Sequence, residues 1–331
     1  MTREPDARDS DRREAQRLSW WTLGSVLTVV AVMGFTAGSS QAMRTALLED
    51  VLSLVPAAVF LLALHFEERP PNARFPYGFL RVNSVAFLVS AVALAGMGAF
   101  LLFESVHTLV KQEHVTIMPV RIGDTTIWMG WLMLAALLYS AIVPMLLARR
   151  KLPLAERLQD KVLHTDAMMQ KADWMTGLAG AAGVLGVGLG FWWADATAAG
   201  VISLSILRDG VNALRTASAE LIDGAPRSLG DPTIADDAAR LHERLRARYP
   251  GGEIMIRETG RFIRAEVCDV SPPPLIDLDD LWPGPPDRRW RLASVTFGPP
   301  PGAPDRRAPD QGRRVADQPV PDMRSPSTRP E

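Results

Sequence analysis

The feature that most constrains this chain is a series of six apolar segments between about residues 18 and 215. Each is long enough to cross a bilayer as a helix, which takes about 20 residues. The segments are Leu18–Gly38, Thr45–Phe66, Arg81–Val110, Thr126–Ala148, Leu158–Phe191 and Ala194–Leu214. A soluble domain would distribute its apolar residues more evenly along the chain. We therefore predict an all-α, six-helix transmembrane domain over residues 18–215.

Basic residues are distributed unevenly among the segments that connect these six runs. The connections after the second, fourth and sixth runs hold most of them: Arg69, Arg74, Arg81, Arg149, Arg150, Lys151, Arg157, Lys161, Arg208 and Arg215. Because short cytoplasmic loops carry an excess of lysine and arginine, both termini are predicted to be cytoplasmic. An even number of spans agrees with this, and Trp20 and Trp21 fall at a span end, where interface aromatics lie. In a bacterium the membrane would be the inner (plasma) membrane.

Both ends of the chain differ from its apolar middle. Residues 1–17 alternate acids and arginines, so we predict a disordered cytoplasmic arm there. Residues 299–331 are rich in Pro, Arg and Asp without periodicity, which predicts a disordered tail. The net charge is nearly balanced and no basic stripe is present, which argues against nucleic-acid binding. The single cysteine, Cys268, excludes an internal disulfide framework and a cysteine-cluster zinc site.

Residues 216–298 have the pattern of a small cytoplasmic α+β domain, which we expect to be ferredoxin-like. Thr233–Tyr249 carries its apolar residues on one helix face. Two short strand-like runs, Glu253–Glu258 and Arg261–Val267, flank a Thr-Gly pair that indicates a hairpin, and Trp290–Phe297 is a third strand candidate. A helix followed by strands in this order is typical of a small sheet covered on one face.

Candidate functional side chains open the fifth apolar segment. Asp166, Met169 and Asp173 are three and then four residues apart, so they share one face of a helix. The residues that follow, from Trp174 to Trp193, carry no charge. Carboxylates beside such a run are costly unless they face a wet cavity or bind a cation, so we regard them as functional candidates. The alternative is that both acids lie at the water interface and begin the helix.

The second apolar segment offers further oxygen ligands. Glu49 and Ser53 are four residues apart on one helix face, from which Asp50 is turned by about 100°. If this helix faces the fifth, Glu49, Ser53 and Asp173 would converge on one cation, since hard divalent ions bind several oxygens. The alternative for Glu49 and Asp50 is a helix start, where acids suit the positive end of the dipole.

The chain resembles the cation diffusion facilitator family from about Trp20 to Val267. The likeness includes the six spans, Phe75–Gly78 ahead of the third span, Ala172–Asp173 in the fifth, Ala194–Asp195 in the sixth, and a soluble sheet domain after Leu221–Asp223. The resemblance implies a secondary transporter rather than an enzyme. It would export divalent metal ions by exchange with protons, as a homodimer in the lipid membrane with its soluble domains in the cytoplasm.

The resemblance also implies a transport site of two polar residues on the second span and two on the fifth. These positions are Glu49, Ser53, Met169 and Asp173 in this sequence. Asp173 matches the usual residue and Glu49 is a conservative change, whereas Ser53 and Met169 replace stronger ligands. Asp166, one turn from Met169, would then supply the missing carboxylate. An oxygen-rich set suits Mn²⁺, Fe²⁺, Co²⁺ or Mg²⁺ better than it selects Zn²⁺, although zinc stays open. The metal is cargo, and no cofactor is expected.

Two other functions compete with metal efflux. Ser53 and Met169 depart from the expected ligands, which allows a transport-inactive scaffold or sensor derived from the family. A more remote alternative is an intramembrane aspartyl enzyme that uses Asp173 and Asp195 as an acid/base pair. The Gly-x-Gly-Asp pattern of such enzymes is absent, because Gly188-Leu-Gly190 is followed by Phe-Trp-Trp-Ala.

Overall fold

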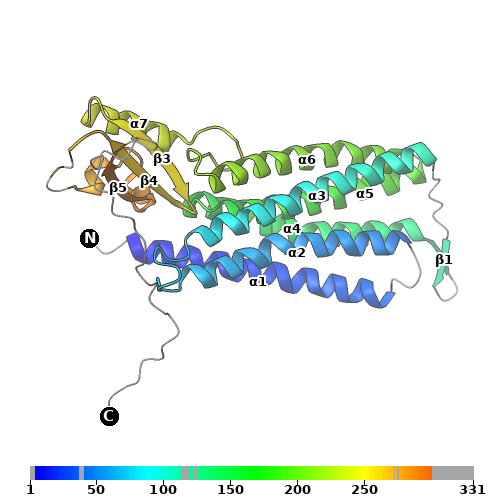
Figure 1. Cartoon of the computed structure of the whole chain (residues 1–331). Helices are drawn as coiled ribbons and strands as arrows, with labels where there is room; N and C mark the ends of the chain where they lie inside the picture. Colours follow the sequence, from blue (N-terminus) through cyan, green and yellow to red (C-terminus); the bar gives the residue numbers. More distant parts are fainter. Residues whose placement is uncertain are drawn as a thin grey trace, which may run out of the picture.

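A computed structural model describes residues 4–36, 41–112, 119–122, 125–191, 193–271, 273 and 276–299. Within these residues, six long helices lie side by side, and a small region of helix and strand packs at one end of them (Figure 1). The helices are α1 (Glu4–Thr36), α2 (Gln41–Glu67), α3 (Arg81–Lys111), α4 (Met129–Leu158), α5 (Lys161–Gly188) and α6 (Ala194–Leu221). A hairpin of β1 (Pro119–Ile122) and β2 (Thr125–Trp128) lies at the other end.

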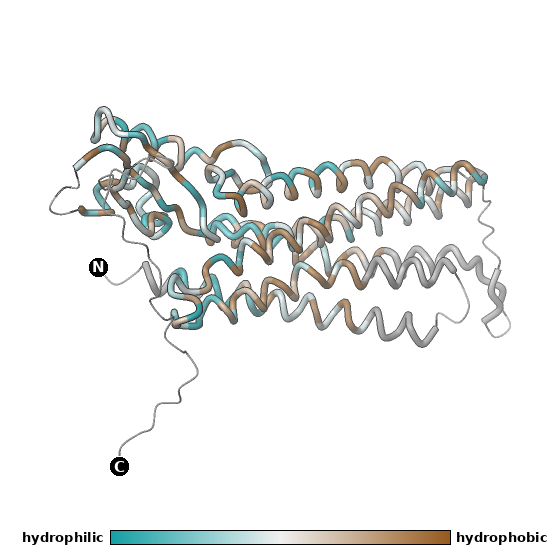
Figure 2. The backbone as a smooth tube through the Cα atoms, in the orientation of Figure 1, coloured by the Kyte–Doolittle hydropathy of each residue, from teal (hydrophilic) through white to brown (hydrophobic). Residues whose placement is uncertain are grey.

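Each predicted apolar segment lies largely within one of the six long helices. Apolar residues dominate α3 and the described part of α2, while polar residues gather in the first turns of α1, in the C-terminal region and in the link from α2 to α3 (Figure 2). By length and hydropathy, Arg81–Lys111 is the one described helix that is apolar enough to cross a membrane. The side chains of residues 29–36, 41–50 and 129–137 lie outside the described set. A bundle of six spans therefore stays a prediction.

An apolar core at the C-terminal-domain end holds the six helices together. Phe60 and Leu64 of α2, Phe87 of α3, Leu158 of α4 and Leu163 of α5 are buried in one cluster. Leu18 of α1 and Ala217 of α6 complete it. Since a buried leucine or phenylalanine contributes roughly 1.5–3 kcal/mol, this cluster is a major source of stability for the bundle.

Two glycines bring α3 and α6 into backbone contact. A Cβ atom at Gly98 of α3 would lie 2.5 Å from the backbone nitrogen of Leu207, and one at Gly210 of α6 would lie 2.5 Å from the backbone of Ala95. Only a residue without a side chain fits at either position. Small residues at helix crossings allow this kind of close packing in membrane proteins.

The C-terminal region is a three-stranded sheet with helices on one face. It contains α7 (Asp236–Arg248), β3 (Glu253–Thr259), β4 (Phe262–Cys268), α8 (Leu278–Leu281), η1 (Pro286–Arg291) and β5 (Leu292–Gly298). The sheet order is β3-β4-β5, with β3 antiparallel and β5 parallel to β4. Leu241 and Leu245 of α7 pack on Ile263, Ala265 and Val267. A ferredoxin-like sheet has the order βαββαβ and so four strands, one more than the described residues of this region contain.

Buried charges join this sheet to the helix bundle. Arg261, in the turn between β3 and β4, pairs with Glu67 at the end of α2 and lies 3.6 Å from Asp160. Lys161, at the start of α5, pairs with Glu220 of α6 at 3.0 Å and with Glu258 of β3. Burial raises the pKa of Glu220, and the nearby Lys161 opposes that rise. The sheet is thus attached to the ends of α2 and α5 through opposite charges, and Lys161 extends this network to α6.

The first turns of α1 differ from the disordered arm predicted over residues 1–17. From Glu4 onward these residues are helical, because they contact distant parts of the chain. The guanidinium of Arg8 lies 4.1 Å from the ring centroid of Trp290, and Asp11 pairs with Arg157 at 3.0 Å. Arg12 lies 3.6 Å from Glu67. Burial, followed by the positive charges of Arg261 and Arg12, lowers the pKa of Arg8 to about 10, so it stays charged at neutral pH.

Replacing Arg261 should weaken the attachment of the sheet. Arg261→Met leaves Glu67 and Asp160 buried without their shared cation, which should lower the free energy of unfolding by about 3–5 kcal/mol. The thermal midpoint of the detergent-solubilised protein measures this loss. The matched control is Arg248→Met, at an exposed arginine that ends α7, where a change within about 0.5 kcal/mol is expected. Equal midpoints for the two variants would contradict the assigned role of Arg261.

Candidate metal site

The predicted ligand positions lie on two helices that contact each other. α2 packs against α5, and Val55 of α2 joins an apolar cluster with Met169 and Ala172 of α5. Ser53, two residues before Val55, is 2% exposed, and Asp173 is half-buried. Glu49 lies one turn before Ser53 in α2, and its side chain is outside the described set. The structure therefore brings the Ser53 turn of α2 close to the Met169–Asp173 turn of α5.

Met169 is surrounded by apolar side chains. It is fully buried against Ala93, Leu94 and Met97 of α3 and Ile206 of α6. A thioether is a weak ligand for hard cations and a good space-filling group in an irregular core. The position that the family resemblance gives to a ligand is thus part of the packing between α5, α3 and α6.

Asp166 forms a buried ion pair on a different side of α5. Its Oδ2 lies 2.5 Å from Nζ of Lys151 in α4, and both side chains are fully buried. The same Nζ donates to Oγ1 of Thr22 at 2.6 Å, and the Ser19 hydroxyl lies 3.5 Å from Asp166 Oδ2. The charge of Asp166 is therefore balanced by Lys151 of α4, beside hydroxyl groups of α1, whereas Met169 faces α3 and α6. The Oδ1 of Asp166 has no hydrogen-bond partner among the described residues.

The structure does not bring all five predicted residues into one coordination sphere. Among the residues whose side chains are described, no three His, Cys, Asp or Glu side chains lie close enough to hold a metal ion. Glu49 falls outside that set, so any ion that it holds with Asp173 and Ser53 stays a prediction. Asp195, the partner of Asp173 in the enzyme alternative, lies at the start of α6 with its side chain also outside the description.

Two charged residues near the site were not singled out from the sequence. Lys151 was interpreted as a loop residue, yet it lies buried in α4. No local pattern links it to Asp166, which is 15 residues away on the next helix. Asp209 lies inside α6, within the predicted sixth span. The sequence alone could have identified Asp209 as a functional candidate, because it is a carboxylate within an apolar segment.

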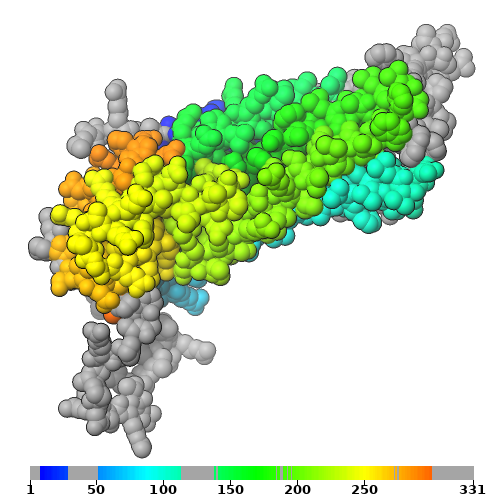
Figure 3. Space-filling view, turned by 90° about the horizontal axis from the view of Figure 1, so that it is seen from above, coloured from blue at the N-terminus to red at the C-terminus, as the bar shows by residue number. Residues whose placement is uncertain are grey.

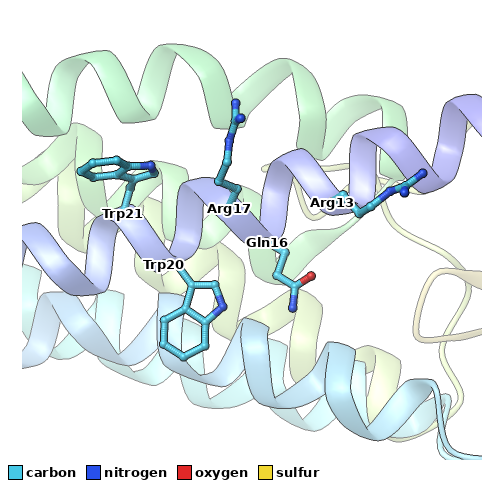
Figure 4. A pocket seen from close by; sticks show the side chains of 5 residues that line it. All are labelled: Arg13, Gln16, Arg17, Trp20 and Trp21. Atoms are coloured by element: carbon cyan, nitrogen blue, oxygen red, sulfur yellow. The ribbon is translucent and has the colours of Figure 1, made fainter.

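The outer face of α1 carries an aromatic and basic patch. A surface hollow of about 470 Å³ is lined by Arg13, Gln16, Arg17, Trp20 and Trp21, all from this helix. Trp20 is 60% and Trp21 67% exposed, and in the view of Figure 4 the Trp21 ring lies above the ribbon of α1 and the Trp20 ring below it. Arginines one to two turns from exposed tryptophans are typical of a helix that passes from water into the lipid headgroup layer.

The ion pair of Lys151 and Asp166 gives a stability prediction. Lys151→Met leaves a buried carboxylate without its cation and should lower the free energy of unfolding by about 3–5 kcal/mol. The double variant Lys151→Met/Asp166→Leu removes both charges and should recover most of that loss. Thermal unfolding in detergent checks both. A single variant as stable as the parent would show that the pair contributes nothing.

Comparisons with known proteins agree with this arrangement. A family model described as the cation efflux transmembrane domain matches residues 21–222. The chain is 28% identical to zinc transporter ZitB of Escherichia coli K12 over 233 residues, which cover 69% of this chain and 66% of that protein. It is 22% identical to the manganese efflux system protein MneS of Bacillus subtilis over 185 residues, covering 56% of this chain and 60% of that protein.

A third relative is matched over a longer stretch. The probable cation efflux system protein Rv2025c of Mycobacterium tuberculosis is 25% identical over 258 residues, covering 76% of this chain and 69% of that protein. The chain spans slightly less than two thirds of the length of ZitB and MneS. The family model covers more than half of the chain and includes α2 to α6 and the second half of α1. The chain therefore belongs to the cation efflux family, the cation diffusion facilitators, as its motifs predicted.

Proposed function

We propose that this protein exports a divalent metal cation across a membrane in exchange for protons. The observation that carries the proposal is the packing of α2 against α5, with Val55, Met169 and Ala172 in one apolar cluster, within a bundle that matches the cation efflux domain. Two relatives are described as a zinc transporter and a manganese efflux system, which supports a divalent cation as the cargo. Membership of a transporter family also favours transport over catalysis.

In the proposed mechanism the ion binds between α2 and α5. Carboxylate oxygens of Glu49 and Asp173 and the hydroxyl of Ser53 are the ligands, completed by water. Because protons and metal ions compete for the same oxygens, protonation on the far side releases the ion, and deprotonation restores the site. Asp166 is not included in this ligand set, because Lys151 already balances its charge.

The proposed donors suit a hard or borderline cation. Carboxylate, hydroxyl and water ligands favour Mn²⁺, Fe²⁺, Co²⁺ or Mg²⁺, whereas zinc selection is usually assisted by imidazole or thiolate. Met169, buried among apolar side chains, supplies neither. Manganese is accordingly the first ion to test, with zinc as the comparison.

The proposed orientation places both termini in the cytoplasm. The basic residues between the helices favour this arrangement, and the headgroup layer would then surround Trp20 and Trp21. Family membership supports a homodimer.

The rival function, a transport-inactive scaffold or sensor, is favoured by the burial of Met169. Transport by the purified protein would separate the two functions, because a scaffold or sensor would move no metal.

Asp173→Asn should abolish metal transport. The amide keeps the size of the side chain but loses the negative charge that binds the cation and accepts the proton. Metal-dependent proton flux in proteoliposomes measures the effect, and a fall of at least about 100-fold, or about 2.7 kcal/mol, is expected for a lost ligand. Asp236→Asn, at an exposed acid in the first turn of α7, is the control. Unchanged flux in Asp173→Asn would refute the site, and no flux in the parent protein would favour the scaffold.

Met169→His should shift metal selectivity towards zinc. An imidazole at this position adds a nitrogen ligand one turn before Asp173, and nitrogen ligands favour Zn²⁺ over Mn²⁺. The ratio of Zn²⁺ to Mn²⁺ transport should rise by about tenfold, which corresponds to about 1.4 kcal/mol. Met255→His, on β3 of the sheet, should leave the ratio unchanged. A ratio that stays constant in Met169→His would mean that this position does not face the ion.

A further inference from the structure

A cavity of about 300 Å³ lies between α3, α5, α6 and the linker that precedes α7. Its walls include polar and titratable side chains from three parts of the chain: His164, Thr165, Asp209, Thr216, Ser228 and Asp231. The cavity lies on the side of the bundle next to the C-terminal region, whose place at one end of α4 to α6 is visible in Figure 3. This space, which we call the Asp209 cavity, is separate from the turn that carries Asp173.

The linker forms the outer wall of the Asp209 cavity by close contact with His164. Gly230 has a φ of +75°, and a Cβ atom there would lie 2.9 Å from Nε2 of His164. Only glycine combines this backbone conformation with such a short approach. His164 Nδ1 is buried and has no hydrogen-bond partner among the described residues. The ring is therefore held in place by packing, with a nitrogen free for another donor or a water.

The wall of the Asp209 cavity holds one lysine and two aspartates. Lys161 pairs with Glu220 and Glu258, and Glu258 also lies 3.4 Å from Arg291, so these four charges balance one another. Asp209 and Asp231 add two further carboxylates. Within the described part of the chain, the Asp209 carboxylate takes part in no ion pair or side-chain hydrogen bond. A partly enclosed space with excess negative charge attracts cations and raises their local concentration.

A second, much smaller space lies beside the Asp209 cavity. It measures about 10 Å³, shares Leu94, Met168 and Asp209 with the larger cavity, and reaches Lys171 and Ala172. A space of this size holds about one water molecule. Asp209 therefore borders both spaces, and Ala172 in the smaller one is the chain neighbour of Asp173.

We propose that the Asp209 cavity is an intake site, where a divalent cation is held by Asp209 and His164 before it moves to Asp173. No three metal-binding side chains in the described residues lie close enough to chelate a bare ion. The ion is therefore held with most of its water shell, as divalent ions that lose water reluctantly usually are. The positive charge of Lys171, in the smaller space, repels the ion until the negative charge of Asp173 attracts it. The direction of ion movement in this inference rests on the proposed transport function, whereas the binding of an ion in the cavity does not depend on it.

Transport kinetics give the first test. In proteoliposomes, Asp209→Asn should raise the KM for Mn²⁺ by about tenfold, and kcat should stay within about twofold, because saturating metal compensates for a weaker intake site. Asp209→Glu should restore the parent KM, and Asp236→Asn should match the parent. An unchanged KM in Asp209→Asn would overturn the proposal. A fall in kcat of more than about twofold would overturn it as well. Asp173→Asn, unlike Asp209→Asn, should lose metal flux at every metal concentration.

A binding measurement keeps the proposal testable if the parent protein transports nothing. Mn²⁺ added to purified Asp173→Asn protein should still bind weakly, with the electron paramagnetic resonance signal of a hydrated ion. The double variants Asp173→Asn/Asp209→Asn and Asp173→Asn/His164→Gln should weaken that binding by at least about fivefold, whereas Asp173→Asn/Asp236→Asn should retain it. Equal Mn²⁺ binding in all four proteins would overturn the intake site without bearing on Asp173. If the parent protein binds Mn²⁺ as expected but transports none, only the transport function is overturned.

Discussion

The requirement that a buried charge has an opposite charge beside it governs both halves of this molecule. Removing a carboxylate or an ammonium group from water costs several kcal/mol unless a partner and hydrogen bonds compensate. In the helix bundle the requirement links Lys151 of α4 to Asp166 of α5. Where the bundle meets the sheet, it links Arg261 to Glu67 and Lys161 to Glu258. The sheet is therefore held in one place by pairings that only one arrangement of the helices satisfies.

The fifth helix uses each of its faces for a different purpose. Asp166 turns towards α1 and α4, where it is neutralised, and Met169 turns towards α3 and α6, where it fills space. Asp173, one turn after Met169, is half-buried, and it is the carboxylate of this helix to which we assign the ion in the proposed transport site. A sequence spacing that places three side chains within one broad helical face does not place them in one site, because α5 has neighbours on all sides.

Local patterns in the sequence predicted the elements well and the long-range pairings poorly. Apolar runs of about 20 residues mark α2 and α3, and alternation marks β3 and β4, because each signal is contained within a few turns or strand residues. The helical start of α1 was missed, because Arg8 contacts Trp290 across almost the whole chain. The partner of Asp166 was missed for the same reason: Lys151 belongs to another helix, and its charge resembles that of a cytoplasmic loop. Asp209 was visible in the sequence as an acid within an apolar run, but its neighbours in space were not.

The glycine contacts between α3 and α6 limit how this molecule can change shape. Gly98 and Gly210 bring the two backbones so close that neither helix has a layer of flexible side chains on which to slide. Any motion that opens the interior to one side and then to the other would therefore carry α3 and α6 together as a single rigid strut. The start of α3 and the link after α6 are tied to each other by Arg81 and Asp223, and Asp223 also accepts from Arg257 of β3. A change in the sheet would then be transmitted directly to the wall of the Asp209 cavity.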